Sequence, residues 1–143
     1  MTCRFDGEME YRMYALSDTK DFRTEELTLL FHSVGWDLTT DPLLLQTAMK
    51  NSTTIISAWD GNKLVGIIRS MDDSVWSANI DCLLVHKDYH GRGIGTALLT
   101  ELLARIGHIE YISVSPSDPS NNSFYEKQGF KKIEGSSLLQ RVK

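Results

Sequence analysis

The chain has 143 residues, of which 41% are hydrophobic and 24% charged, so its composition predicts one ordinary globular domain over residues 1–143. Its formal net charge of −4 argues against general affinity for nucleic acid or for an anionic membrane. No apolar run reaches membrane-spanning length and the first residues contain no apolar signal core, so we expect a cytoplasmic protein. The two cysteines, Cys3 and Cys82, lie far apart and do not indicate a disulfide framework.

The first part of the chain predicts a strand followed by two helices. Residues 10–16 mix aromatic and polar side chains and are predicted as the strand. Thr24 precedes two acidic residues, which are favourable in a first helical turn, and Gly35 ends the apolar stripe that follows. Asp41 before Pro42 is the pattern of an N-cap followed by a proline at the first helical position, so a second, short helix begins there.

The middle of the chain predicts a meander of three strands. Residues 53–59 are rich in β-branched side chains, and the Asp60–Gly61 pair that follows is a strong hairpin signal. Residues 64–71 form the return strand, in which Gly66 indicates a bulge or a close approach of another element. After a polar turn, residues 76–85 form the third strand.

The stretch from residue 80 to residue 103 combines the end of this strand, a glycine-rich turn and a helix. Residues 80–85 form an apolar run interrupted only by Asp81, and three alternating glycines follow within residues 91–95. Glycine lets backbone N–H groups face a ligand, and the first N–H groups of a helix have no internal partner. The combination predicts an anion site with phosphate as its usual guest, and a plain strand-to-helix turn is the alternative.

The spacing of these glycines does not fit the two common nucleotide-binding motifs. A P-loop requires lysine and then Ser or Thr after its last glycine, whereas Ile94, Gly95 and Thr96 follow Gly93 here. A dinucleotide-binding fold requires G-x-G-x-x-G early in the chain, whereas this G-x-G-x-G comes late. Nucleotide binding is therefore the weaker hypothesis for this turn.

The last part of the chain predicts a strand, a loop, a short helix and two closing strands. Residues 110–114 form the strand, and residues 116–122 are turn formers. The short helix carries Tyr125 and is closed by a glycine. Residues 130–133 and 138–142 are predicted to close the sheet.

Two motifs in the second half of the chain resemble those of the GNAT superfamily of N-acetyltransferases. With Val85 in first place, the run H-G-R-G-I-G from His90 to Gly95 resembles the acetyl-CoA motif V-x-x-x-x-(Q/R)-x-x-G-x-(G/A). His90 departs from the Gln or Arg that the family usually has. About thirty residues on, F-Y-E-K-Q-G-F from Phe124 to Phe130 resembles the family's F-Y-E-K-x-G-F. The resemblance covers roughly residues 53–133.

The resemblance implies a fold and an activity. The fold would be the α/β (α+β) GNAT fold, a mixed and largely antiparallel central sheet of about six to seven strands with about four helices and a splay after the fourth strand. The activity would be transfer of an acetyl group from acetyl-CoA to a primary amine of a small molecule or peptide, by direct attack on the thioester. We expect no metal, because His86 and His90 straddle a turn rather than share a helix face. The oligomeric state stays open, with a homodimer as one alternative, since dimers are common among the resembling proteins.

The resemblance also assigns roles to residues. Tyr125 would be the general acid for the leaving thiolate, and a backbone N–H near Leu83 would face the oxyanion. Asp81 is the candidate base, with a water chain as the alternative. Lys87, like Arg92 and Lys127, is a candidate contact for the adenosine phosphates. The residues expected to hold the coenzyme are Leu83, Leu84, Val85, His90, Gly91, Arg92, Gly93, Ile94, Gly95, Thr96, Asn121, Asn122 and Lys127.

Cys82 and two aromatic residues leave alternatives open. Relatives often have an acidic residue at position 82, so Cys82 and His90 leave a non-catalytic acyl-CoA-binding or sensor module as a second hypothesis. Cys82 is expected to be a small buried thiol, since no histidine partner of the kind that activates a nucleophile is assigned. Phe31 and Trp36 are candidates for an acceptor-binding wall, with ordinary core packing as the alternative.

Overall fold

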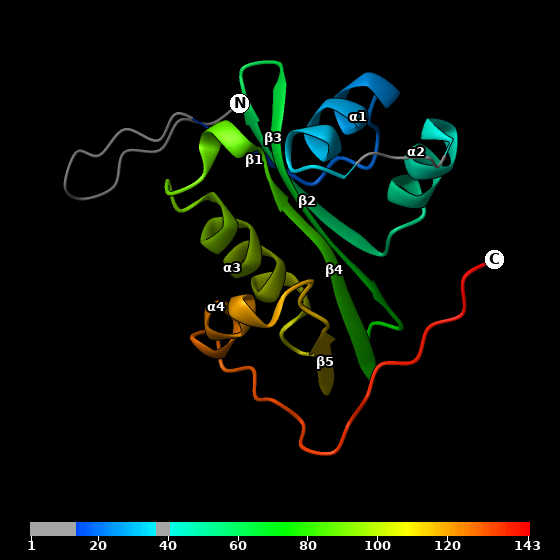
Figure 1. Ribbon diagram of the computed structural model, residues 1–143, viewed down its shortest axis with the longest axis vertical. Helices are drawn as coiled ribbons and strands as arrows, with labels where there is room; N and C mark the ends of the chain where they lie inside the picture. The colour runs from blue at the N-terminus through cyan, green and yellow to red at the C-terminus, as the bar shows by residue number, and fades with distance from the viewer. Residues whose placement is uncertain (1–13, 37–40) are drawn as a thin grey trace.

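The protein, seen in a computed structural model that describes residues 14–36 and 41–143, is a sheet between two layers of helices (Figure 1). Helices α1 (Thr24–Ser33) and α2 (Pro42–Lys50) cover one face, and α3 (Ile94–Ile106) and α4 (Asn122–Glu126) lie on the other side. Among the described residues the sheet has five strands, which lie in chain order. These strands are β1 (Ala15–Ser17), β2 (Thr54–Asp60), β3 (Lys63–Asp72), β4 (Ser77–Val85) and β5 (Tyr111–Val114).

Local side-chain signals set the ends of the first two helices. The Glu26 carboxylate accepts the backbone N–H of Arg23 at 3.0 Å just before α1, and Gly35 adopts a φ of +82° just after it. The Asp41 carboxylate accepts the N–H of Leu43 at 2.9 Å at the start of α2. The helix starts and stops predicted from the sequence are therefore confirmed here.

The two faces of the sheet bury separate sets of apolar side chains. Successive residues of a strand point to opposite faces, so Ile55 packs on the α1 side and Ile56 on the α3 side. The α1 side gathers Leu27, Leu30, Phe31, Met49, Ile67 and Leu84, and the α3 side gathers Ile68, Ile80, Leu98, Leu99 and Leu102. Because both faces are covered, β2 and β3 read in the sequence as nearly continuous apolar runs.

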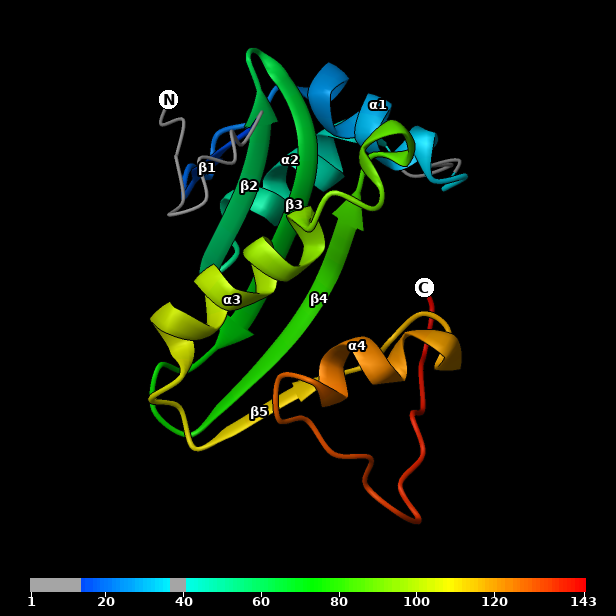
Figure 2. The same ribbon diagram turned by 90° about the vertical axis from the view of Figure 1, so that its left-hand side faces the viewer.

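The last two strands run parallel and then separate. The β4–β5 register extends from Ser77 opposite Tyr111 to Ile80 opposite Val114, and β5 ends there while β4 continues to Val85. Figure 2 shows β5 diverging from β4, with α4 following it. The second half of β4 therefore has one edge without a neighbouring strand among the described residues, as the expected splay requires.

A bulge interrupts β4 where this separation begins. Ile67 pairs with Leu84 and Arg69 pairs with Asp81, so the two residues between them on β4 oppose the single Ile68 on β3. One of these two residues, Cys82, has a φ of +55°, an uncommon conformation for a residue with a side chain. The bulge turns the strand and changes which residues face the α3 side.

The two closing strands expected at the end of the chain do not form. The prediction of six to seven strands is wrong for the described residues, because residues 130–133 and 138–142 form no strand. Apart from the half-buried Phe130, their apolar side chains are exposed, by 70% at Ile133 and 76% at Leu138, and the tail loops away from the sheet (Figure 1). A strand requires hydrogen bonds to a neighbour, which an apolar pattern alone does not supply.

Two further sequence predictions, the first strand and the absence of a membrane-spanning segment, can be compared only with the described residues. The first strand covers Ala15–Ser17, and the beginning of the predicted range, residues 10–13, lies outside the described residues, as does Cys3. In the part of the chain that the structure describes, no helix is long and apolar enough to cross a membrane.

Candidate active site

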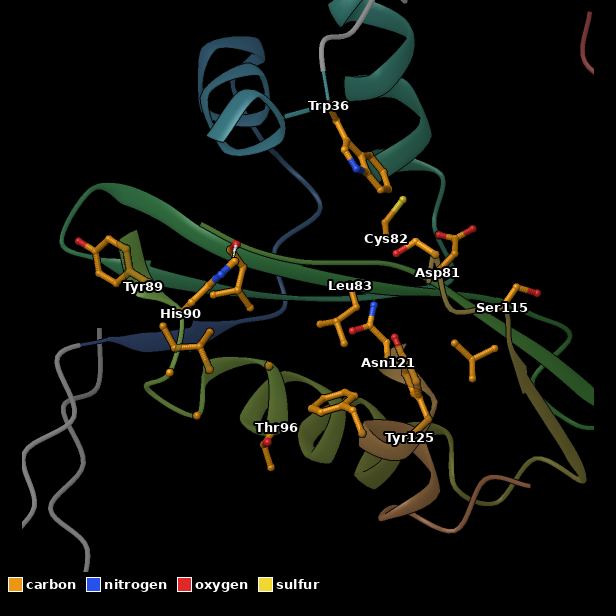
Figure 3. Close-up of a pocket in the computed structure, with 18 residues that line it drawn as sticks. Trp36, Asp81, Cys82, Leu83, Tyr89, His90, Thr96, Ser115, Asn121 and Tyr125 are labelled. Carbon is orange, nitrogen blue, oxygen red and sulfur yellow. Dashed lines mark hydrogen bonds between the residues drawn. The ribbon is translucent and has the colours of Figure 1, made fainter. Parts of the chain in front are cut away.

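A cavity of about 690 Å³ opens where β4 and β5 separate. Its walls come from the second half of β4, the turn before α3 and the segment between β5 and α4 (Figure 3). The residues that line it are Trp36, Asp81, Cys82, Leu83, Val85, Tyr89, His90, Gly91, Gly93, Ile94, Gly95, Thr96, Val114, Ser115, Ser117, Asn121, Phe124 and Tyr125. The splay of the sheet thus brings both sequence motifs to one cavity.

The turn before α3 presents backbone donors to this cavity. Gly91 and Gly93 have φ values of +78° and +77°, which glycine adopts without the steric cost of a side chain. The first intrahelical bond runs from the N–H of Ala97 to the carbonyl of Gly93 at 3.0 Å, so the N–H groups before Ala97 in the first turn have no partner within the helix. No acidic side chain lies in this first turn. The arrangement suits an anion.

His90 fastens this turn to the end of β4. Its Nε2 lies 2.7 Å from the carbonyl oxygen of Val85, and because a carbonyl only accepts, Nε2 carries the proton and donates it. The contact therefore links the turn before α3 to the last residue of β4. The histidine that departs from the family pattern therefore has a defined structural partner.

The backbone of β4 offers its free edge to the cavity. The N–H of His86 donates to the carbonyl of Val65 on β3 at 2.8 Å. Backbone groups of successive residues alternate between the two edges of a strand, so the groups of Val85 turn away from β3. Leu83, two residues earlier, has the same orientation and also lines the cavity.

Asp81 lies in the cavity wall directly before the bulge, where Arg69 holds it. Arg69 Nε lies 2.6 Å from Oδ1 of Asp81 and Nη2 lies 3.3 Å from Oδ2, and the arginine also contacts the carbonyl of Ala48 at 3.3 Å. Burial lowers the pKa of Arg69, but its hydrogen bond to Asp81 and nearby acidic groups outweigh burial and raise that pKa overall. The carboxylate is fixed in place with both oxygens accepting from one guanidinium.

Cys82 also lines the cavity, as a neutral thiol. Burial, and then the negative charge of Asp81, raise the pKa of Cys82 from its ordinary 9.0 to about 12. Because the thiolate is the reactive form, this thiol is a poor nucleophile at neutral pH. Cys82 is half-buried and not fully buried as predicted, and its high pKa supports the prediction that it is not a nucleophile.

Tyr125 stands on the opposite wall, from α4. Its side chain is only 8% exposed and contacts the rings of Phe124 and Phe130 edge-on, with centroids 5.1 and 5.9 Å away. Burial raises its pKa above the ordinary value for a phenol. Among the described residues no group hydrogen-bonds to its hydroxyl, and Figure 3 shows the ring beside Asn121 across from Leu83.

The cavity contains most, though not all, of the residues predicted from the sequence. Leu84 is buried with the α1-side core, because the strand turns it away from the cavity. Arg92, Asn122 and Lys127 do not line the cavity either. Of the two aromatic candidates, Trp36 lines it, whereas Phe31 is 2% exposed and packs in the core.

Sequence reasoning missed residues on the β5 side of the cavity. Ser115 and Ser117 follow β5 directly, and Tyr89 belongs to the turn before α3. Because β5 runs parallel to β4, its end lies beside the exposed half of that strand. The pairing of β4 with β5 is the signal that would have identified Ser115 and Ser117.

Comparisons with known proteins agree with this geometry. The family model described as an acetyltransferase (GNAT) domain matches residues 25–141.

The chain belongs to the GNAT acetyltransferase family.

Similar proteins support this assignment and the fold. An uncharacterized N-acetyltransferase, ycf52, of Pyropia yezoensis is 34% identical over 131 residues, which cover 87% of this chain and 74% of the relative. A Staphylococcus aureus protein described as a probable acetyltransferase superposes with a TM-score of 0.80 at 21% identity, covering 92% of this chain and 99% of the other. A GNAT-family acetyltransferase of Streptococcus pneumoniae gives 0.74 at 26% identity, covering 91% and 100%. This GNAT protein is therefore an acetyltransferase with a mixed α/β fold.

Proposed function

We propose that this GNAT protein transfers an acetyl group from acetyl-CoA to a primary amine of a small molecule or peptide, by direct attack on the thioester, within a single domain. The observation that carries the proposal is the continuity of one cavity. It joins the unpartnered N–H groups at the start of α3, the free edge of β4 and the side chain of Tyr125. These are the three things that such a reaction requires: an anion grip, an extended track and a proton donor.

The chemistry of the cavity fits coenzyme A. Unpartnered N–H groups from Gly91 to Thr96 suit the pyrophosphate, and the backbone of Leu83 and Val85 suits an extended amide-containing arm, as a neighbouring strand would. Asn121 and Ser115 add polar side chains on the facing wall. The coenzyme itself supplies the activated acetyl group as a thioester.

Residues at the inner end of the cavity would assist the transfer. The backbone N–H of Leu83 faces away from β3 and is placed to stabilise negative charge on the acetyl oxygen. Tyr125 would donate its hydroxyl proton to the departing sulfur. Its raised pKa keeps the phenol protonated at neutral pH, which supports the role of an acid.

Asp81 is assigned to the acceptor amine. An alkylammonium ion must lose a proton before it attacks, and a fixed carboxylate attracts it to the cavity. Because both oxygens of Asp81 already accept from Arg69, we assign to this carboxylate the attraction and orientation of the amine. Water in the open cavity then takes the proton.

A turnover assay with a substitution at Tyr125 tests the proposal. Free thiol release from acetyl-CoA is measured with a panel containing a polyamine, an aminoglycoside and a lysine-containing peptide. We expect at least one amine to increase release, and Tyr125→Phe to lower kcat about 100-fold, since a positioned acid contributes on the order of 10² or more. The Kd for acetyl-CoA, measured by calorimetry, should change less than about twofold because the ring remains. Unchanged kcat in this variant would exclude the acid role.

A further inference from the structure

The walls of the cavity carry little positive charge for a ligand with several phosphate charges. None of the described residues that line it is a lysine or an arginine, and Asp81 adds a negative charge at the inner end. Backbone N–H groups are sufficient to bind a pyrophosphate, because each of its two phosphate groups carries only about one negative charge. A phosphate monoester carries about −1.5 to −2 charges near pH 7 and is best paired with side-chain cations.

Two cations lie against the ring of Tyr89, which is one of the residues that line the cavity. The guanidinium carbon of Arg92 lies 4.8 Å from the ring centroid, and Nζ of Lys63 lies 5.2 Å from it. Tyr89 itself lines the cavity, in the turn before α3. Lys63 comes from the first residue of β3, so the tertiary structure brings the β2–β3 hairpin to the coenzyme end of the cavity.

The Tyr89 ring is held rigidly enough to serve as a platform. Its hydroxyl donates to the carboxylate of Asp60 at the other end of the hairpin turn, and the ring of His86 packs edge-on against it with centroids 5.7 Å apart. The hydrogen bond to Asp60 raises the pKa of Tyr89, so the hydroxyl keeps its proton. The platform joins the hairpin to the glycine-rich turn.

Both cations are available to a ligand. Within the described residues neither Lys63 nor Arg92 forms an ion pair, whereas Arg23, Arg69 and Arg105 each contact a carboxylate. The carboxylates of the cluster are Asp60, which accepts from Tyr89, and Asp88, whose charge acts on His86. Burial and then the charge of Lys63 lower the pKa of His86, so the field of this lysine reaches the turn.

We propose that Lys63 and Arg92, both positioned by the ring of Tyr89, form the subsite for the 3′-phosphate of coenzyme A. The subsite makes the protein prefer coenzyme A to its 3′-dephospho form. This inference rests on the proposed use of acetyl-CoA and adds a specificity determinant from outside the glycine-rich motif. The 3′-phosphate is the monoester of the coenzyme, so it is the group that two free cations match.

Calorimetric titration with coenzyme A and with 3′-dephospho-coenzyme A tests the subsite without any acceptor or turnover. We expect the wild-type protein to bind coenzyme A about tenfold more tightly, and the preference to shrink as salt increases. Lys63→Ala and Arg92→Ala should each remove most of the preference, and the double variant all of it. Affinity for the dephospho form should stay within about twofold, because its contacts are untouched.

Lys50→Ala is the matched control for loss of one positive charge. Lys50 ends α2, next to the end of β3 where the N–H of Thr53 donates to the carbonyl of Ser70 at 3.1 Å. Ser70 lies roughly 20 Å along the strand from Lys63, so the control should keep the full preference. Melting curves of all variants should match the wild type.

Three results would overturn the subsite. Equal wild-type affinities for the two coenzymes would show that the 3′-phosphate is not recognised. Equal weakening of both coenzymes by Lys63→Ala would show a general effect of charge or of loop structure. Absence of binding for both coenzymes would overturn the proposed function itself, which separates that failure from the failure of the subsite.

Discussion

Cys82 illustrates how a single residue combines an unusual backbone with an unusual chemistry. It adopts a φ of +55° inside the bulge, and its thiol faces the cavity beside Asp81. Its elevated pKa follows from that position, since a buried thiolate next to a carboxylate is unfavourable. A cysteine at this position thus lines the cavity without introducing a reactive thiolate.

Alkylation kinetics check the state of this thiol. In a Cys3→Ser background, the rate of Cys82 modification by iodoacetamide should be slow at pH 7.5 and rise about tenfold per pH unit with no plateau by pH 10. Peptide mass spectrometry gives the rates. A plateau near pH 9, the ordinary pKa of a thiol, would contradict a pKa of about 12.

The same pKa predicts a dependence of stability on alkaline pH. Because the folded-state pKa of Cys82 is raised, its contribution to stability is complete below pH 9.0 and is lost as pH rises toward about 12. The free energy of unfolding of the wild type should therefore fall more steeply above pH 9 than that of Cys82→Ala. Urea titrations at pH 8 and pH 10.5 measure the difference, and parallel losses would contradict it.

Individual site residues divide into those a motif reveals and those only the fold reveals. Tyr125 and the glycines of the turn could be predicted because they lie in contiguous runs with defined spacing. Lys63 could not, because it reaches Tyr89 through the pairing of β3 with β4 and not through any local pattern. The orientation of Cys82 was also beyond a local pattern, because the bulge places it on the α1 side whereas alternation from Ile80 would place it on the α3 side.

At the scale of elements, helix α3 and strand β3 meet at a residue without a side chain. A Cβ on Gly66 would lie 3.0 Å from Cδ1 of Leu98 and 3.1 Å from Cγ2 of Ile94. Gly66 also lies beside the register shift of the β2–β3 pair, at Ala58. Both meanings of a glycine in a strand, the bulge and the close approach, therefore apply at this position.

Substitution at Gly66 should loosen this contact. Gly66→Ala should lower the free energy of unfolding by about 1–2 kcal/mol, because the fully buried Leu98 and Ile94 cannot yield without moving α3. Urea unfolding measures the loss. With Leu98→Ala in the same chain, the extra cost of Gly66→Ala should shrink, because only the contact to Ile94 remains, and strictly additive losses would contradict the steric explanation.

The elements that could be predicted were those whose pattern is local. The meander, the long helix and the capped helices follow from alternation, turn residues and N-caps. Residues 130–142 carry strand-like side chains, but in the described structure no neighbouring strand pairs with them, so the closing strands do not form. Pairing is a non-local property, and an apolar pattern reports only which side chains prefer burial.

At the scale of the whole molecule, the sheet couples two cores. Trp59 lies on the α1 side, stacked on Phe22 with ring centroids 6.1 Å apart, and Leu102 lies on the α3 side. The strands between them contribute side chains to both cores. Damage to one core should therefore destabilise the other.

A substitution in the α3-side core, monitored by the fluorescence of a tryptophan in the α1-side core, checks this coupling. In a Trp36→Phe, Trp76→Phe background, Leu102→Ala should lower the free energy of unfolding by about 3 kcal/mol, since Leu102 is fully buried. Fluorescence of Trp59 and far-ultraviolet circular dichroism should shift together, as a two-state domain requires. If the midpoint of the Trp59 fluorescence transition stayed unchanged while the midpoint of the circular dichroism transition shifted, the two cores would unfold as independent units.

The contact between His90 and Val85 has a consequence for the turn before α3. Because the carbonyl of Val85 can only accept, this bond depends on the proton carried by Nε2 of His90. A side chain without such a donor at position 90 would release the glycine-rich turn from the end of β4, although the glycines themselves would be unchanged.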